Sequence, residues 1–255
     1  MRKMNIEQKV LSSQRVLDEG TGKEIYIVSD RWGNDAVIPT SIRIGIATVQ
    51  VVLNDGEFYS FDPLRGKLNL DLATNNVDCF IKNTLITLMQ VLLYPSDIFR
   101  LVENEALEHF YKPILMGFYT MLKLNKFSLA HADDEEEARL PRPRRINING
   151  TPFKVIYVDD LMEVDEEETY GLFVVQDGIY VSTKIEGDEP IHDHFVDVTF
   201  LHEIFHAIIY ELGLNGTVSN GDPENIELEE IVVETLASRI VELLHLNNLK
   251  IVKRA

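Results

Sequence analysis

Residues 199–213 read TFLHEIFHAIIYELG, a stretch in which two histidines four positions apart lie within a helical hydrophobic pattern. Apolar residues at helical spacing predict a helix over about residues 195–212 with one side buried. These residues are Phe200, Leu201, Phe205, Ile208, Ile209 and Leu212. Gly213 follows directly and is a typical helix stop signal, so we expect the helix to end there.

The segments around this helix complete a small α+β domain over residues 150–255. Three strand candidates precede it, at residues 152–160, 171–176 and 179–185, and Asp177-Gly178 between the last two marks a hairpin. A second helix is predicted over about residues 223–246, with Asp222 as its N-cap. A short sheet followed by two helices is therefore expected.

The N-terminal part, residues 1–130, changes from strand-like to helix-like patterns. Strand candidates lie at residues 24–29, 41–53 and 57–61, and the second one shifts its alternation near Ala47-Thr48, which indicates a bulge or break. Helical spacing follows at residues 77–93 and 97–124, where Pro113 is expected to kink or end the helix. This N-terminal mixed α+β domain contains no catalytic constellation of residues, and its role stays open.

A charged, proline-containing segment separates the two parts. Residues 131–145 read HADDEEEARLPRPRR, with five consecutive acids followed by four arginines and two prolines. Segregated charge and proline do not build a packed core, which favours an exposed connector over residues 131–149. The predicted fold class is thus α+β, with an N-terminal strand-then-helix domain, a linker and a small C-terminal domain.

The charge distribution limits the function classes. Of the net charge of −18, −16 belongs to residues 146–255, which carry 6 Lys+Arg and 22 Asp+Glu. Such a field repels nucleic acid and attracts metal cations or basic peptides, so we expect no nucleic acid on the C-terminal domain.

The compartment is predicted from other features. Only Cys79 is available for redox chemistry, the first residues lack an apolar signal core, and no uncharged apolar run reaches the ~18–20 residues of a membrane span. A cytoplasmic protein without a membrane partner is expected.

The pentad His202-Glu203-Ile204-Phe205-His206 carries the chemistry. Histidines four apart project from one helix face, where a single tetrahedral Zn²⁺ can take both imidazoles. Glu203 lies about 100° around the helix from His202, so it flanks the metal and can accept a proton from water that the metal acidifies. This spacing predicts metal-dependent hydrolysis.

A third ligand is expected from the second helix, IELEEIVVETLASRI. Glu230 and Glu234 are four apart and share one face. We predict that Glu230 ligates the metal and that Glu234 orients a ligand histidine through its other ring nitrogen. Glu224 and Glu227 fit a solvated helix start, an explanation that applies less firmly to Glu229.

These residues resemble the ImmA/IrrE-type zinc metallopeptidases and their phage and prophage relatives, over about residues 150–248. His202, Glu203, His206, Glu230 and the pair Leu236-Ala237 match the family pattern, whereas Glu234 stands where relatives often have Asn. The resemblance implies a zincin-like domain and zinc-dependent hydrolysis of a peptide bond in a protein substrate. It also implies a bacterial or phage-infected cytoplasm and, often, a regulatory protein as target. A basic target would suit the acidic domain.

Two alternatives stay open. In the first, the chain is a non-catalytic binding or assembly protein whose structural zinc is closed by a fourth ligand, His192 or His194. The same two histidines could instead stabilise the transition state of hydrolysis. In the second, the arginine-rich segment 139–145 occupies the cleft as a substrate or an inhibitor.

Overall fold

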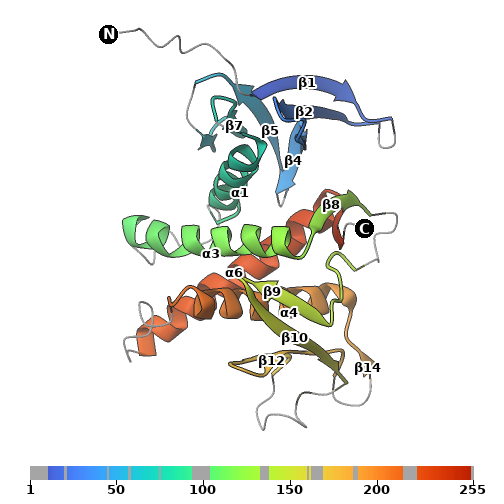
Figure 1. Ribbon diagram of the computed structural model, residues 1–255, viewed down its shortest axis with the longest axis vertical. Helices are drawn as coiled ribbons and strands as arrows, with labels where there is room; N and C mark the ends of the chain where they lie inside the picture. Colours follow the sequence, from blue (N-terminus) through green and yellow to red (C-terminus); the bar gives the residue numbers. More distant parts are fainter. Residues whose placement is uncertain are drawn as a thin grey trace. The chain divides into compact units, whose positions relative to one another are not determined.

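The computed structural model describes residues 11–19, 22–44, 46–56, 59–74, 76–93, 104–132, 138–159, 161, 169–185, 189–214 and 223–253. It has the predicted α+β class and divides into two compact units, Met1–Val91 and Leu92–Ala255 (Figure 1). Within the described residues, no helix is long and apolar enough to cross a membrane. Predictions for residues 57–58, 97–103 and 133–137, for residue 160 and for Asp222 lie outside the described residues.

The first unit consists of two sheets and a helix. Strands β1 (Leu11–Leu17), β2 (Glu24–Asp30) and β3 (Asp35–Pro39) form an antiparallel meander. The second sheet has the order β4-β5-β7-β6, in which β5 and β7 run parallel. Its strands are β4 (Ser41–Ile44), β5 (Ala47–Asn54), β6 (Ser60–Asp62) and β7 (Lys67–Asp71). The predicted break near Ala47 is confirmed as the turn between β4 and β5.

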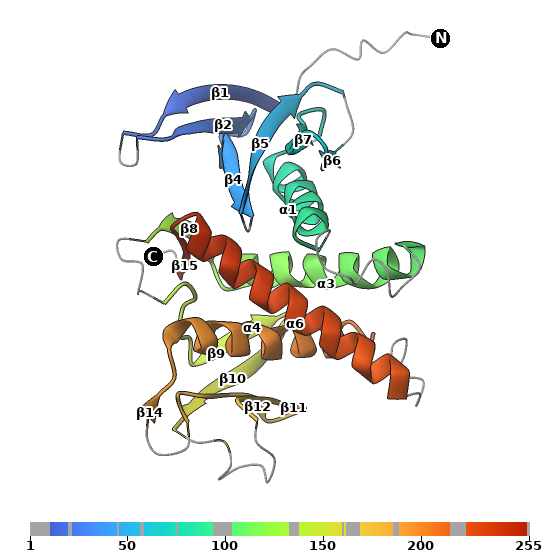
Figure 2. The same cartoon turned by 180° about the vertical axis from the view of Figure 1, so that it is seen from behind.

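Helix α1 (Val77–Leu93) has the predicted bounds and lies beside β5 and β7 in both views (Figure 2). The buried Asp30 links the first residue of α1 to the β2–β3 turn through hydrogen bonds. This carboxylate accepts backbone N–H bonds from Trp32 and Asn34 at 2.9 and 3.0 Å, and from Val77 at 3.5 Å. The ring of Phe80, which is fully buried, lies 6.3 Å from that of Tyr59.

The second unit is built on a four-stranded sheet of order β11-β12-β10-β9. Its strands are β9 (Arg145–Ile148), β10 (Thr151–Val158), β11 (Gly171–Val174) and β12 (Gly178–Ser182). The β11–β12 hairpin is confirmed at Asp177, whose N–H donates to the Val174 carbonyl. Two-stranded ladders join β13 (Lys184–Ile185) to β14 (Glu189–Pro190) and β8 (Phe127–His131) to β15 (Leu249–Lys253).

Three helices complete this unit: α3 (Asn104–Leu124), α4 (Asp193–Glu211) and α6 (Pro223–Leu246). Helix α4 lies between the sheet and α3, and α6 packs across it (Figures 1 and 2). The predicted bounds of α6 coincide with the observed ones. Helix α3, by contrast, continues past Pro113, because the residues around it, such as Tyr111 and Ile114, are anchored in the core.

The division of the chain differs from the predicted one. The sequence predicted a domain boundary at residues 131–149, whereas the first unit ends at Val91 and the second begins at Leu92. The reason is that α3 packs on α4 and β9, and that β8 pairs with the C-terminal strand β15. Residues 104–130 therefore belong to the same unit as the candidate site.

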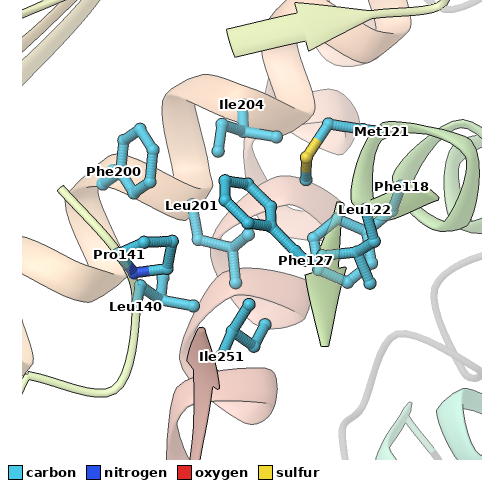
Figure 3. Close-up of a pocket in the computed structure, with 10 residues that line it drawn as sticks. All are labelled: Phe118, Met121, Leu122, Phe127, Leu140, Pro141, Phe200, Leu201, Ile204 and Ile251. Atoms are coloured by element: carbon cyan, nitrogen blue, oxygen red, sulfur yellow. The ribbon is translucent and has the colours of Figure 1, made fainter. Parts of the chain in front are cut away.

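The predicted connector also packs more than expected. Arg139 and Leu140 are buried, and Leu140 lines an apolar pocket with Phe200 of α4 and Ile251 of β15 (Figure 3). The Arg139 carbonyl accepts the backbone N–H of Ile251 at 2.7 Å. Arginines and prolines predicted an exposed segment, but its single leucine is apolar enough to anchor it in the core.

Candidate metal centre

Helix α4 presents the two histidines of the HEIFH pentad on one face. The helix packs against α3, α6, β11 and β12, and most of its residues are buried, including Phe205 and Ile208. His202 and His206 keep 19% and 17% of their side-chain surface exposed, and their rings lie 4.7 Å apart. The predicted i, i+4 pairing on one face is thus observed.

Helix α6 brings Glu230 to these histidines. One carboxylate oxygen lies 3.4 Å from His202 Nε2 and the other 3.3 Å from His206 Nε2. The two Nε2 atoms are 3.0 Å apart. Among the residues that the structure describes, His202, His206 and Glu230 form the group that could hold a metal ion.

Each ligand histidine has a carboxylate at its other ring nitrogen. His202 Nδ1 lies 3.2 Å from Glu234, which also accepts the Ser238 hydroxyl at 3.0 Å. His206 Nδ1 lies 3.0 Å from Glu229. A carboxylate only accepts, so each Nδ1 is assigned a proton, which leaves Nε2 as the ring nitrogen through which each histidine could bind a metal. The sequence predicted this role for Glu234 and missed it for Glu229.

This donor set fits a cation. Two Nε2 atoms and a carboxylate converge within 3.0–3.4 Å, an arrangement of potential ligand atoms that protons or a metal cation between them stabilise. Ligand atoms about 2.0–2.1 Å from a tetrahedral Zn²⁺ are themselves about 3.3–3.4 Å apart, close to the spacing seen here. The three side chains therefore suit a tetrahedral metal ion.

The electrostatics of the three side chains also favour a cation at this site. Burial opposes a charge on His206, but hydrogen bonds to Glu229 and Glu230 outweigh it and raise the pKa of His206 to about 10. Hydrogen bonds from His202 and His206 hold the pKa of Glu230 well below its usual range. The site thus keeps an ionised carboxylate and attracts a positive charge to the histidines.

Glu203 is placed apart from the ligand atoms, as its position on the helix predicts. It is only 6% exposed, and the Phe173 backbone N–H of strand β11 is a hydrogen-bond donor near its carboxyl group. Burial raises the pKa of the Glu203 carboxyl, and the neighbouring His202 and His206 offset part of this effect. A carboxylate with a raised pKa beside a metal centre is suited to take up a proton.

The structure does not bring His192 and His194 to this centre. His192 caps α4, its Nδ1 accepting the His194 backbone N–H at 3.2 Å. The ring of His194 lies 6.4 Å from that of His245, at the far end of α6. His202 lies eight positions after His194, which corresponds to about 12 Å along the helix. Neither a fourth ligand nor a transition-state donor is provided by these two residues.

The arginine-rich segment docks on another face of α4. The fully buried Asp197 accepts the backbone N–H groups of Arg139 and Leu140 at 2.6 and 3.2 Å and pairs with the Arg142 guanidinium. Asp197 precedes His202 by five residues, which places it about 140° around the helix from the ligand face. The described part of the segment therefore lies away from the metal centre.

Comparisons of the chain with known protein families, with curated proteins and with solved structures found no match. The fold and the site define an α+β protein with a His-His-Glu group that could hold a metal ion.

Proposed function

We propose that the protein is a zinc-dependent metallopeptidase that hydrolyses a peptide bond in a protein substrate. The observation that carries this proposal is the convergence of His202, His206 and Glu230, with the buried Glu203 on the same helix. Two imidazoles and one carboxylate are a ligand set typical of catalytic zinc sites, which leave the fourth position open.

Accessibility of the site supports catalysis over a closed structural centre. The Glu230 side chain is 53% exposed, so a substrate can approach from its side. Within the described residues, no fourth protein ligand joins the three-residue group. Structural zinc sites are instead closed by four protein ligands.

The residues of the site have different roles in the proposed reaction. Zinc, when bound by His202, His206 and Glu230, supplies a Lewis acid that acidifies water and polarises the scissile carbonyl. Glu203 takes the proton of the attacking water and delivers it to the leaving amine. Glu229 and Glu234 hold the two imidazoles with their Nε2 lone pairs toward the ligand position.

The resemblance to the ImmA/IrrE-type metallopeptidases supports the same activity, because the ligand and base positions match at His202, Glu203, His206 and Glu230. The net charge of −16 over residues 146–255 favours encounter with a basic protein. We therefore propose a basic regulatory protein of a bacterial or phage-infected cell as the substrate.

The test combines metal content with hydrolysis. Protein purified without a histidine tag is expected to contain about one zinc per chain and to cleave fluorescein-labelled casein or members of a quenched fluorescent peptide library. Glu203→Gln should keep the zinc and lose hydrolysis by about 10²–10⁴-fold. His202→Ala should lose the metal itself. Full activity of Glu203→Gln would refute the proposed mechanism, and a wild-type protein that binds no zinc would refute the proposed function.

A further inference from the structure

Strand β11 contains a glycine that its backbone conformation does not explain. Gly171 is the first residue of β11, and its φ lies outside the left-handed region in which glycine is favoured. Among the described strands, β11 lies at the edge of its sheet and pairs with β12 alone. A glycine inside a strand often marks a place where another group approaches closely.

That group is the Glu203 side chain. A Cβ atom placed on Gly171 would lie 2.5 Å from Glu203 Oε1 and 2.9 Å from its Cγ. It would also lie 2.6 Å from Thr199 Cγ2, one turn earlier on α4. Because these distances are below van der Waals contact, any side chain at position 171 must displace Glu203, Thr199 or the strand.

The same strand also binds the Glu203 carboxylate. The backbone N–H of Phe173 is a hydrogen-bond donor near this carboxyl group and opposes the rise in its pKa that burial causes. Phe173 is held in turn by its ring, which lies 5.6 Å from Phe153 and 5.8 Å from Tyr210. A carboxylate has two oxygens, so one can accept the Phe173 N–H while the other accepts a proton from water.

We infer that Gly171 is a positioning residue for the reaction: its missing side chain and the Phe173 N–H form a seat on β11 that holds Glu203 in place as the proton acceptor. This inference rests on the proposed function. The transferred proton passes from the attacking water to Glu203 and then to the leaving amine, so the seat itself undergoes no chemical change. A general base acts efficiently only within hydrogen-bond reach of its proton, which gives the seat a direct effect on rate.

The principal test is Gly171→Ala in the full-length, zinc-loaded protein. We expect about one zinc per chain to remain, because the three atoms nearest to the added Cβ belong to Glu203 and Thr199 and not to a ligand. On the labelled casein or on a peptide from the library, kcat should fall at least ~100-fold with little change in KM. Leu172→Ala alters the opposite face of the same strand and serves as the matched control, with kcat expected to stay close to that of the wild type.

A second variant separates displacement of Glu203 from crowding of the helix. Gly171→Ala/Thr199→Ser removes the Thr199 methyl group that the new Cβ would meet and leaves the overlap with Glu203. We expect no recovery of kcat. Recovery would overturn the inference, because it would show that the packing of Thr199, and not the seat of Glu203, sets the rate.

An NMR measurement tests the seat without hydrolysis. In protein labelled with ¹⁵N-phenylalanine, the Phe173 amide signal is assigned by its loss in Phe173→Leu. A hydrogen bond to a carboxylate moves an amide proton downfield, so this signal should move upfield in both Glu203→Gln and Gly171→Ala. An unchanged signal in either variant, or full kcat in Gly171→Ala, would overturn the inference while leaving the proposed function intact. A zinc-loaded wild type that cleaves no substrate would overturn the proposed function, and the catalytic role of Gly171 with it.

Discussion

Glu229 is expected to control metal affinity although it is not a ligand. Its carboxylate lies 3.0 Å from His206 Nδ1 and keeps only 17% of its side-chain surface exposed. Replacing it with leucine leaves the Nδ1–H of His206 without this acceptor and removes the negative charge that favours a cation nearby. The ring is then free to turn its Nε2 away from the metal.

The size of the effect can be worked out from this contact. A hydrogen bond to a charged group contributes about 1.5–3 kcal/mol, which corresponds to roughly 10- to 150-fold in affinity. Glu229→Leu should therefore weaken zinc binding by about 10- to 100-fold, in line with the usual effect of such partners. Glu229→Gln keeps an acceptor without the charge, so about half the free energy and a 3- to 12-fold loss are expected.

Glu234 offers a comparison within the same site. It makes the equivalent contact with His202 at 3.2 Å, but 60% of its side chain is exposed to solvent. Solvent screens exposed charge pairs to ~1 kcal/mol or less, so Glu234→Gln should cost less than about fivefold. The more buried carboxylate, Glu229, should therefore have the larger effect on zinc affinity, although both lie at similar distances from their histidines.

The assay is competition for Zn²⁺ with a chromophoric chelator, on protein shown to be folded by circular dichroism. Glu242→Leu is the matched control, since it removes a carboxylate from the same helix about 18 Å beyond Glu230 and should leave the zinc affinity unchanged. If Glu229→Leu binds zinc within twofold of the wild type, or if Glu234→Gln is the more damaging change, the reasoning is refuted.

Two further predictions concern the metal and the core. Zinc binding should release about one proton between about pH 6 and 9, because a pKa of about 10 keeps His206 charged without metal and ligation makes it neutral. Affinity should therefore rise with pH, and calorimetry in two buffers of different ionisation enthalpy measures the proton; a release near zero would contradict this. Gly117→Ala in α3 should lower the free energy of unfolding by about 1–3 kcal/mol, because its Cβ would lie 2.4 Å from Ile208 Cγ2. Urea denaturation measures this loss, and an unchanged midpoint would show that the two helices tolerate the extra carbon.

Local patterns predicted the helices well and the strands less completely. Helices α1 and α6 have the predicted bounds because their apolar residues recur over many turns, which leaves little choice of register. Strand β1, with the sequence LSSQRVL, is mostly exposed and shows little alternation that could identify it. Strands β8 and β15 pair across more than a hundred residues, a contact that no local pattern indicates.

The domain boundary shows the same limit. Five acids, four arginines and two prolines at residues 131–145 suggested a connector, but the burial of Leu140 and the pairing of Arg142 with Asp197 depend on where α4 lies. Composition describes a segment's own preference for water, whereas its burial depends on partners elsewhere in the chain.

The sequence predicted the part of the site whose residues all lie on one helix. The spacing of His202, Glu203 and His206 sets their directions on α4 before any tertiary contact is known. The contact of Glu229 depends on how α6 crosses α4. Glu229 and Glu230 are neighbours about 100° apart on their helix, and both reach His206 because its two ring nitrogens face opposite ways.

Several faces of α4 have different partners, which explains why both apolar and charged residues of this helix are buried. One face carries the histidines, another seats Glu203 on β11, a third holds the segment 139–142 through Asp197, and a fourth packs on α3. Two glycines of ordinary backbone conformation, Gly117 of α3 and Gly171 of β11, lie where an added Cβ atom would come within 2.4–2.6 Å of α4 side chains. Because the helix is held between these two close contacts, the spacing from its histidines to β11 is fixed by packing. Substitution of Gly117 should therefore lower the free energy of unfolding, whereas substitution of Gly171 should displace the proton acceptor Glu203.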